Sequence, residues 1–284
     1  MINKLNNYLK LIRFSNPSGT ILLFLPILFT YLLFSFQANH SLTLILFALE
    51  AFLMRSAGCI INDIIDNQYD KKVARTKSRP LASGAVNIYE AIILLSLILL
   101  LALLVSLFFQ LKTIIFASLL IIPIVIYPFT KRFFILPQLF LGLVFNSSIF
   151  IFALELNIRF DLALFILYIA TVFWTIAYDT IYAHQDKLDD KKLGLKSSAL
   201  TFSHYNKEII ILCYSLFFFG FILISLLKNF NVIIIISLLV TCLITIIKLI
   251  KLNLENSKKC KIYFKNNNLL GFLLAMQILI AQIL

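Results

Sequence analysis

Long apolar runs constrain this chain more than any other feature. Nine segments near 20 residues in length carry few charged side chains, and about 20 apolar residues is the length that a helix needs to cross a bilayer. Hydrophobic residues make up 61% of the 284 residues, against roughly 45–50% in soluble domains. We therefore predict an all-α polytopic membrane protein with transmembrane helices at 18–36, 41–61, 86–109, 112–129, 134–153, 161–183, 207–227, 231–250 and 268–284.

Two of these segments have additional features. The fourth contains Pro123 and Pro128, and because proline removes a helical hydrogen bond we expect that helix to be kinked or broken. The first follows Lys4, Lys10 and Arg13, as the apolar part of a signal peptide would. It is about 19 residues long and lacks a clear small-residue cleavage site, which favours an uncleaved span.

The basic residues are distributed unequally between the two sides of the membrane. With nine spans, 22 of the 25 Lys and Arg lie on the side of the N-terminus, and only Lys112, Arg159 and Lys228 lie on the other. By the positive-inside rule the N-terminus is cytoplasmic and the C-terminus is outside. The net charge of +12 is then explained by topology. We expect a multi-pass protein of a bacterial inner membrane, with the lipid bilayer and not nucleic acid as its partner.

Carboxylates are rare but clustered. Seven of the eight Asp lie in two stretches, residues 62–70 (NDIIDNQYD) and 179–190 (DTIYAHQDKLDD), each at the predicted cytoplasmic end of a span. If the helix continues, Asn62, Asp66 and Asp70 share one face, and Asp63 overlaps that face, so spacing does not choose between Asn62 and Asp63. A second stripe contains Asp179, Tyr182, Asp186 and Asp190.

Clustered carboxylates repel one another, and a divalent cation offsets that repulsion. Oxygen ligands without nearby Cys or His fit Mg²⁺, which often bridges to phosphate. Solvated carboxylates paired with Lys and Arg would explain one cluster equally well. Two clusters, each after the second helix of a predicted group of four, favour the metal site. This placement predicts a single domain over residues 1–284, built from two four-helix pseudo-repeats and a ninth helix.

Basic residues follow both acidic clusters. Lys and Arg beside metal-binding carboxylates are what a diphosphate requires, because they bind its outer oxygens. Topology and anionic lipid explain most of the lysines, and Arg75, Arg79, Lys131 and Arg132 are the better candidates for ligand contact. An apolar bundle with such a mouth suits a lipid diphosphate with an isoprenoid tail.

Four stretches resemble a known family. NDIIDNQYD with RTKSRPLASGAV (residues 75–86) resembles the first Asp-rich motif of the UbiA superfamily of intramembrane prenyltransferases, and YDTIYAHQDKLDDKKLGLKSSAL (residues 178–200) resembles the second. LIRFSNPSGTILLFLP (residues 11–26), YPFTKRFFILPQLFLG (residues 127–142) and the second motif resemble the 4-hydroxybenzoate polyprenyltransferases of ubiquinone synthesis. After Phe202 only hydrophobicity and helix order are similar.

The resemblance implies nine helices around a central cavity that opens to lipid, and it implies roles for particular residues. One Mg²⁺ would bind Asn62, Asp66 and Asp70, and the other Asp186 and Asp190. Asp63 would orient a neighbouring Arg. Substrate binding would involve Arg13, Arg75, Arg79, Tyr127, Lys131 and Arg132, and one of Arg13 and Arg132 would meet the benzoate carboxylate. We assign no role to His184.

The implied reaction moves a polyprenyl chain from its diphosphate to the ring carbon ortho to the hydroxyl of 4-hydroxybenzoate. Metal ions stabilise the departing diphosphate, and an apolar pocket keeps water from the allylic cation. Asp186 or a phosphate oxygen would take the ring proton. Another aromatic acceptor is the main alternative. A transporter is disfavoured because the acids lie at one rim of the membrane and not at its midplane, and a non-catalytic scaffold would not need Asp66 or Asp186.

Overall fold

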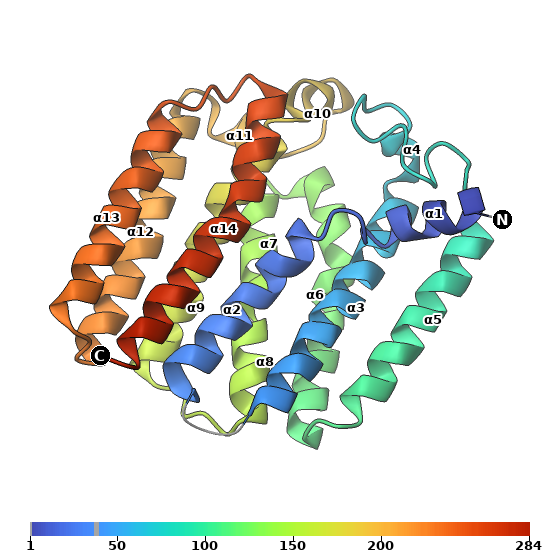
Figure 1. The fold of residues 1–284 in the computed structure, drawn as a ribbon. Helices are drawn as coiled ribbons and strands as arrows, with labels where there is room; N and C mark the ends of the chain where they lie inside the picture. The colour runs from blue at the N-terminus through green and yellow to red at the C-terminus, as the bar shows by residue number, and fades with distance from the viewer. Residues whose placement is uncertain (1, 37–39) are drawn as a thin grey trace.

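The computed structural model describes residues 2–36 and 40–284, and the fold is a bundle of helices (Figure 1). The helices, in chain order, are α1 (Ile2–Leu11), α2 (Ser18–Phe34), α3 (Ser41–Ile65), α4 (Asn67–Asp70), α5 (Ile88–Ser106), α6 (Leu111–Phe133), α7 (Pro137–Asn146), α8 (Ser148–Glu155), α9 (Leu162–Ala183), α10 (Lys187–Leu193), α11 (Ser198–Thr201), the 3₁₀ turn η1 (Ser203–Tyr205), α12 (Asn206–Leu227), α13 (Val232–Ile250) and α14 (Ser257–Ala281).

Seven helical segments in the described part of the chain are long and apolar enough to cross a membrane: α3, α5, α6, α7 with α8, α9, η1 with α12, and α13. They have 19 to 25 residues, which corresponds to roughly 30 Å or more at 1.5 Å per residue. The other two predicted spans differ from these seven. α2 is apolar but has 17 residues. α14 has 25 residues and begins at Ser257, well before the predicted 268, with a first half rich in Lys and Asn.

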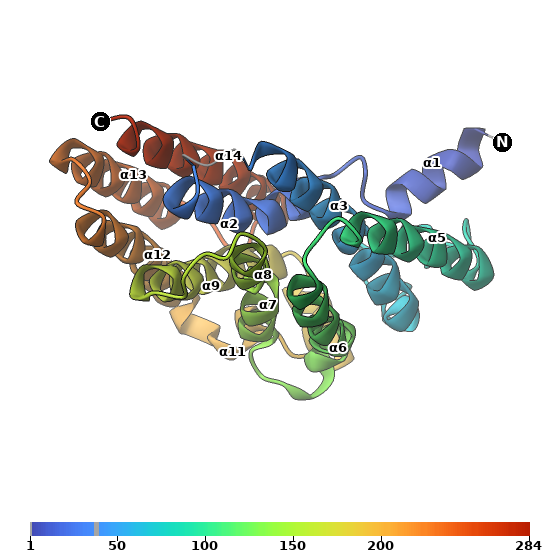
Figure 2. The same ribbon diagram turned by 90° about the horizontal axis from the view of Figure 1, so that it is seen from below.

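The helices divide into inner and outer members of the bundle. α9 is buried most, and it packs against α12, α7 and α14. Trp174 of α9 stacks on Phe217 of α12 with ring centroids 4.9 Å apart. α5, α6 and α13 lie toward the outside (Figure 2) and expose most of their Leu and Ile side chains. An apolar outer surface of this kind is what lipid requires.

The predicted break in the fourth span is not found. α6 is continuous from Leu111 to Phe133 although it contains Pro123 and Pro128. The interruption lies in the next span, where α7 ends at Asn146 and α8 begins at Ser148. The Asn146 side chain donates to the backbone oxygen of Gly142 at 2.8 Å and to Thr175 Oγ1 at 2.9 Å, so a buried polar contact with α9 accompanies the interruption.

Both acidic motifs lie where a long helix ends. α3 ends at Ile65, Asp66 occupies the capping position with ψ near 7°, and the short α4 follows. α9 ends at Ala183 and α10 begins at Lys187. Neither helix therefore continues through its motif, which was the condition for each predicted stripe. The turns redirect the chain across the end of the bundle, at the upper edge of Figure 1.

Close packing of α9 on α12 depends on a glycine. A Cβ at Gly220 would lie 2.5 Å from the Cβ of Ala170, whereas a Cβ at Gly58 of α3 would meet nothing within 4 Å. We expect Gly220→Ala to lower the free energy of unfolding by about 1–3 kcal/mol through overpacking. Gly58→Ala is the matched control. We expect its free energy of unfolding to be unchanged or higher by roughly 0.5–1 kcal/mol, because alanine favours a helix more than glycine does. Thermal unfolding in detergent measures both, and equal midpoints would contradict the packing argument.

Candidate active site

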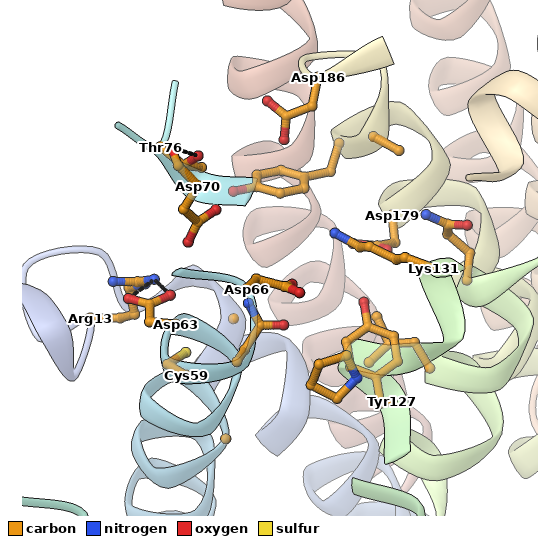
Figure 3. Close-up of a pocket in the computed structure, with 18 of the residues that line it drawn as sticks. Arg13, Cys59, Asp63, Asp66, Asp70, Thr76, Tyr127, Lys131, Asp179 and Asp186 are labelled. Atoms are coloured by element: carbon orange, nitrogen blue, oxygen red, sulfur yellow. Dashed lines mark hydrogen bonds and ion pairs between the residues drawn. The ribbon is translucent and has the colours of Figure 1, made fainter. Parts of the chain in front are cut away.

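The two acidic motifs line one pocket at the end of the bundle. The pocket has a volume of about 270 Å³ (Figure 3). Its lining comes from helices α2, α3, α4, α6, α7, α9, α10 and α14, from the α1–α2 link and from the loops after α4 and α10. The candidate residues that line it are Arg13, Asn62, Asp63, Asp66, Asp70, Arg75, Arg79, Tyr127, Lys131, Asp186 and Asp190. Arg132 is the candidate outside this lining, yet it contacts Asp66 as described below.

Asp63 is the most deeply buried acid of the first motif, with 1% of its surface exposed. Both of its oxygens accept hydrogen bonds from Arg13 Nη2, at 2.7 and 2.9 Å, and Arg79 Nη1 lies 3.1 Å from Oδ1. Burial, the largest single influence, lowers the pKa of Arg13, but the charge and hydrogen bond of Asp63 together with Cys59 outweigh it and the pKa is raised. Asp63 therefore holds two arginines at the mouth of the pocket, the second from the loop after α4.

The other acids of the first motif also meet arginines. Arg79 Nη1 donates to Asp70 Oδ2 at 2.7 Å. Arg132 Nη2 lies 3.5 Å from Asp66 Oδ1, and its guanidinium carbon lies 5.2 Å from the ring centre of Tyr69 and 4.9 Å from that of Phe129. Burial raises the pKa of Asp66, and the charge of Lys131 counteracts this.

The second motif is bound by a residue that follows the first. Arg75 Nε donates to Asp186 Oδ1 at 2.7 Å, its Nη2 pairs with Asp186 Oδ2, and its Nη1 donates to the Tyr182 hydroxyl at 2.8 Å. The backbone amide of Ala74 donates to Asp189 Oδ2 at 3.0 Å. The loop after α4 thus joins two motifs that lie more than 100 residues apart in the chain.

Lys131 faces both motifs. It extends from α6 into the space between them (Figure 3). Burial raises the pKa of Asp190 to about 6, and Lys131 is the main charge that opposes the rise. The mouth of the pocket therefore contains buried acidic oxygens beside one lysine and several arginines. The acidic oxygens suit a cation, and the basic side chains suit an anion.

Arg55, one of the 22 basic residues that the charge count places on the side of the N-terminus, lines the pocket. It lies seven residues before Asn62 on α3, deeper in the bundle, and the Cβ of a residue replacing Gly19 would lie 2.6 Å from its Nε. Its guanidinium carbon is 5.9 Å from the ring centre of Phe145. In the described part of the chain no ion pair involves Arg55. Tyr127 and Asp179 share this lining. The sequence did contain a signal for this residue, because an arginine within a predicted membrane span indicates a functional position.

α14 also contributes to the pocket. The sequence did not predict this contribution, because no motif was recognised after Phe202. Phe264 lines it and packs on Tyr182 with ring centroids 4.6 Å apart. One turn later, Asn267 Oδ1 accepts hydrogen bonds from Trp174 Nε1 and from the Tyr214 hydroxyl, both at 2.8 Å. This buried amide fixes α14 against α9 and α12.

The donor atoms suit a hard cation. Asn62, Asp66, Asp70, Asp186 and Asp190 offer amide and carboxylate oxygens to one pocket, which are the ligands that Mg²⁺ prefers. In the described residues no three His, Cys, Asp or Glu are arranged so that they could hold a metal ion, and arginines pair with Asp66, Asp70 and Asp186. The residue types fit Mg²⁺, and binding requires these side chains to reorient.

A helical bundle with apolar outer helices and an acidic and basic pocket at one end defines a class of multi-pass membrane proteins. Residues 23–274 match the UbiA prenyltransferase family. The chain belongs to this family, which confirms the predicted resemblance.

Relatives in bacteria cover nearly the whole chain. The 4-hydroxybenzoate octaprenyltransferase of Polynucleobacter necessarius is 35% identical over 274 residues, 96% of either chain. That of Haemophilus ducreyi is 36% identical over 272 residues, 96% of this chain and 98% of the relative. That of Neisseria meningitidis serogroup C is 41% identical over 212 residues, 75% of this chain and 72% of the relative.

Solved structures of the family have the same fold. A UbiA homolog from Aeropyrum pernix K1 superposes with a TM-score of 0.71 at 22% identity, over 93% of this chain and 96% of that one. A homolog from Archaeoglobus fulgidus bound to GPP and Mg²⁺ gives 0.66 at 18% identity, over 96% and 99%.

The Asn267 contacts generate a stability prediction. Asn267→Ala leaves the buried Trp174 and Tyr214 donors without an acceptor, and we expect a loss of roughly 1–3 kcal/mol in the free energy of unfolding. Asn266→Ala removes an exposed neighbour of the same type on the same helix and should leave stability almost unchanged. Thermal unfolding of the two variants side by side tests this, and a midpoint for Asn267→Ala equal to that of wild type would be the contrary result.

Proposed function

We propose that this protein transfers a polyprenyl chain from its diphosphate to the carbon ortho to the hydroxyl of 4-hydroxybenzoate, in ubiquinone synthesis. The observation that carries the proposal is one pocket in which two Asp-rich motifs and at least four cationic side chains converge, within a chain that relatives of that activity match over 96% of its length. The pocket's contents suit a metal diphosphate, and its position in an apolar bundle suits a prenyl tail.

The mouth binds the diphosphate. Asn62, Asp66 and Asp70 would hold one Mg²⁺, and Asp186 and Asp190 would hold the other. The two ions would stabilise the negative charge of the departing diphosphate. Arg13, Arg75, Arg79 and Lys131 hold its outer oxygens by charge-assisted hydrogen bonds. Asp63, which is fully occupied by Arg13 and Arg79, orients these two arginines, and Arg132 positions Asp66.

The deeper part of the pocket binds the aromatic acceptor. Arg55 is a cation without a carboxylate partner among the described residues. It pairs with the benzoate carboxylate in place of Arg13, which lies at the mouth, and of Arg132, which lies outside the pocket lining. Tyr127 lines the same region and contacts the ring. The bond between prenyl C1 and the diphosphate oxygen breaks and a bond to the ring carbon forms. The ring proton then leaves to Asp186 or to an oxygen of the released diphosphate.

The topology follows from the charge distribution. α2 and α14 complete nine spans in a single domain, so the N-terminus and the mouth of the pocket face the cytoplasm of a bacterial inner membrane. The pocket is then reached by a diphosphate from the cytoplasmic side and by its prenyl tail from the bilayer.

Product formation tests the reaction. We expect detergent-solubilised protein supplied with 4-hydroxybenzoate and a long-chain polyprenyl diphosphate to form 3-polyprenyl-4-hydroxybenzoate with Mg²⁺ and none with EDTA. Asp66→Ala and Asp186→Ala should each lower the rate by about 100-fold or more, since each removes a charge at the departing group. Glu255→Ala, which changes an exposed acid outside the pocket, is the matched control. Diphosphate consumption without that product would refute the acceptor, and no consumption by folded protein would refute the enzyme.

Replacement of Arg55 separates acceptor binding from donor binding. We expect Arg55→Met to raise KM for 4-hydroxybenzoate by about 30- to 100-fold, because a charged hydrogen bond of roughly 2–3 kcal/mol is lost, and to leave KM for the polyprenyl diphosphate within about twofold. Steady-state kinetics with each substrate varied in turn measures this. A rise in KM for the diphosphate instead would place Arg55 at the mouth.

A further inference from the structure

A second cleft lies between the adjoining ends of α13 and α14, away from the pocket. It has a volume of about 210 Å³ and shares no lining residue with the pocket. Lys248 and Lys251 come from the end of α13, and Lys259, Tyr263 and Asn266 come from the start of α14. The segment that joins the two helices lies at the same end of the bundle as α4 and α10 (Figure 1).

The side chains that line this cleft carry positive charge and no negative charge. It includes three lysines and no Asp or Glu, and in the described residues none of the three forms an ion pair. Three like charges around one small cleft repel one another, and an anion between them removes that repulsion. Positive-inside topology requires lysines on this side of the membrane, but it does not require them to surround one cleft.

The walls of the cleft are held by contacts that leave the lysine heads free. The Tyr263 hydroxyl donates to the backbone oxygen of Thr245 at 3.2 Å, which ties α14 to α13. Asn256 caps α14 by accepting from the amide of Lys259 at 3.0 Å. Cys260, between the lining residues Lys259 and Ile262 in the chain, is buried. The N-terminus of α14 and the C-terminus of α13 meet at this point, so their dipoles offset one another and the lysine side chains supply the net charge.

An apolar surface continues from the cleft along both helices. Ile250 and Ile262 are 55% and 59% exposed next to the lysines, and Leu243 and Leu269 continue the exposed surface toward the middle of the membrane at 58% and 62%. A free phosphate would use only the charged part of this surface. A phospholipid uses both parts, because its phosphate can meet the lysines while the attached acyl chains lie on the apolar surface beside them.

We propose that this cleft is a binding site for the headgroup of an anionic phospholipid, whose acyl chains lie along the outer surface of α13 and α14. The proposal does not depend on the reaction at the pocket, since the two share no residue.

Native mass spectrometry of the detergent-solubilised full chain tests the site. The protein is titrated with phosphatidylglycerol and with phosphatidylcholine of identical acyl chains. We expect phosphatidylglycerol to bind more tightly, and Lys251→Ala/Lys259→Ala to weaken its binding by about tenfold or more. Lys258→Ala/Lys265→Ala removes the same charge from exposed positions of α14 outside the cleft and should change binding less than twofold. Unchanged thermal unfolding and unchanged prenyl diphosphate consumption establish that both variants are folded.

Three results would overturn the proposal. Equal losses in the two double variants would show only general attraction to anionic lipid. Equal binding of phosphatidylglycerol and phosphatidylcholine by wild-type protein would exclude headgroup recognition. Displacement of phosphatidylglycerol by millimolar inorganic phosphate that depends on Lys251 and Lys259 would identify a free phosphate site.

Discussion

The mouth of the pocket depends on one buried carboxylate. Asp63 is 1% exposed, and a lone carboxylate at such a site is strongly disfavoured unless cations pair with it. Arg13 and Arg79 satisfy this requirement from two different segments, the α1–α2 link and the loop after α4. Arg13 even adopts a positive φ of 60°. The acid therefore determines where both arginines lie, and with them two walls of the pocket.

The same loop carries this order to the second motif. Arg79 binds Asp63 and Asp70, and Arg75, one turn earlier, binds Asp186. The two acidic motifs never pair with one another, since like charges repel, and an arginine-bearing loop between them lets both approach one pocket. Any anion that enters competes with Asp186 and Asp70 for these arginines.

Hydropathy predicted the seven segments that are long and apolar enough to span a membrane, because apolar length is a local signal. The motif resemblance, together with the clustered charges, predicted the family and the twelve candidate residues, of which eleven line the pocket. What they could not give depends on tertiary contacts. α3 ends at Ile65 and α9 ends at Ala183. These ends depend on where the chain crosses the end of the bundle, and no capping residue in the sequence predicts them. Arg55 was assigned to topology because a sequence does not show depth. The part of α14 before residue 268 is polar, so a hydropathy window begins too late, and the buried partners of Asn267 come from α9 and α12.

The basic residues serve three physical needs that composition cannot separate. Arg75 and Arg79 compensate buried acids, and their planar donors suit two-point contacts with carboxylates. Lysines on exposed turns match the charge bias that the positive-inside rule describes. Lys248, Lys251 and Lys259 belong to neither group, because they face a cleft that contains no acid. Arg75 and Arg79 thus pair with acids, whereas these three lysines pair with none in the described part of the chain. Lys131 is a lysine inside the pocket beside several arginines, and its compact point charge can meet an acid or an anion without the fixed two-point geometry of a guanidinium.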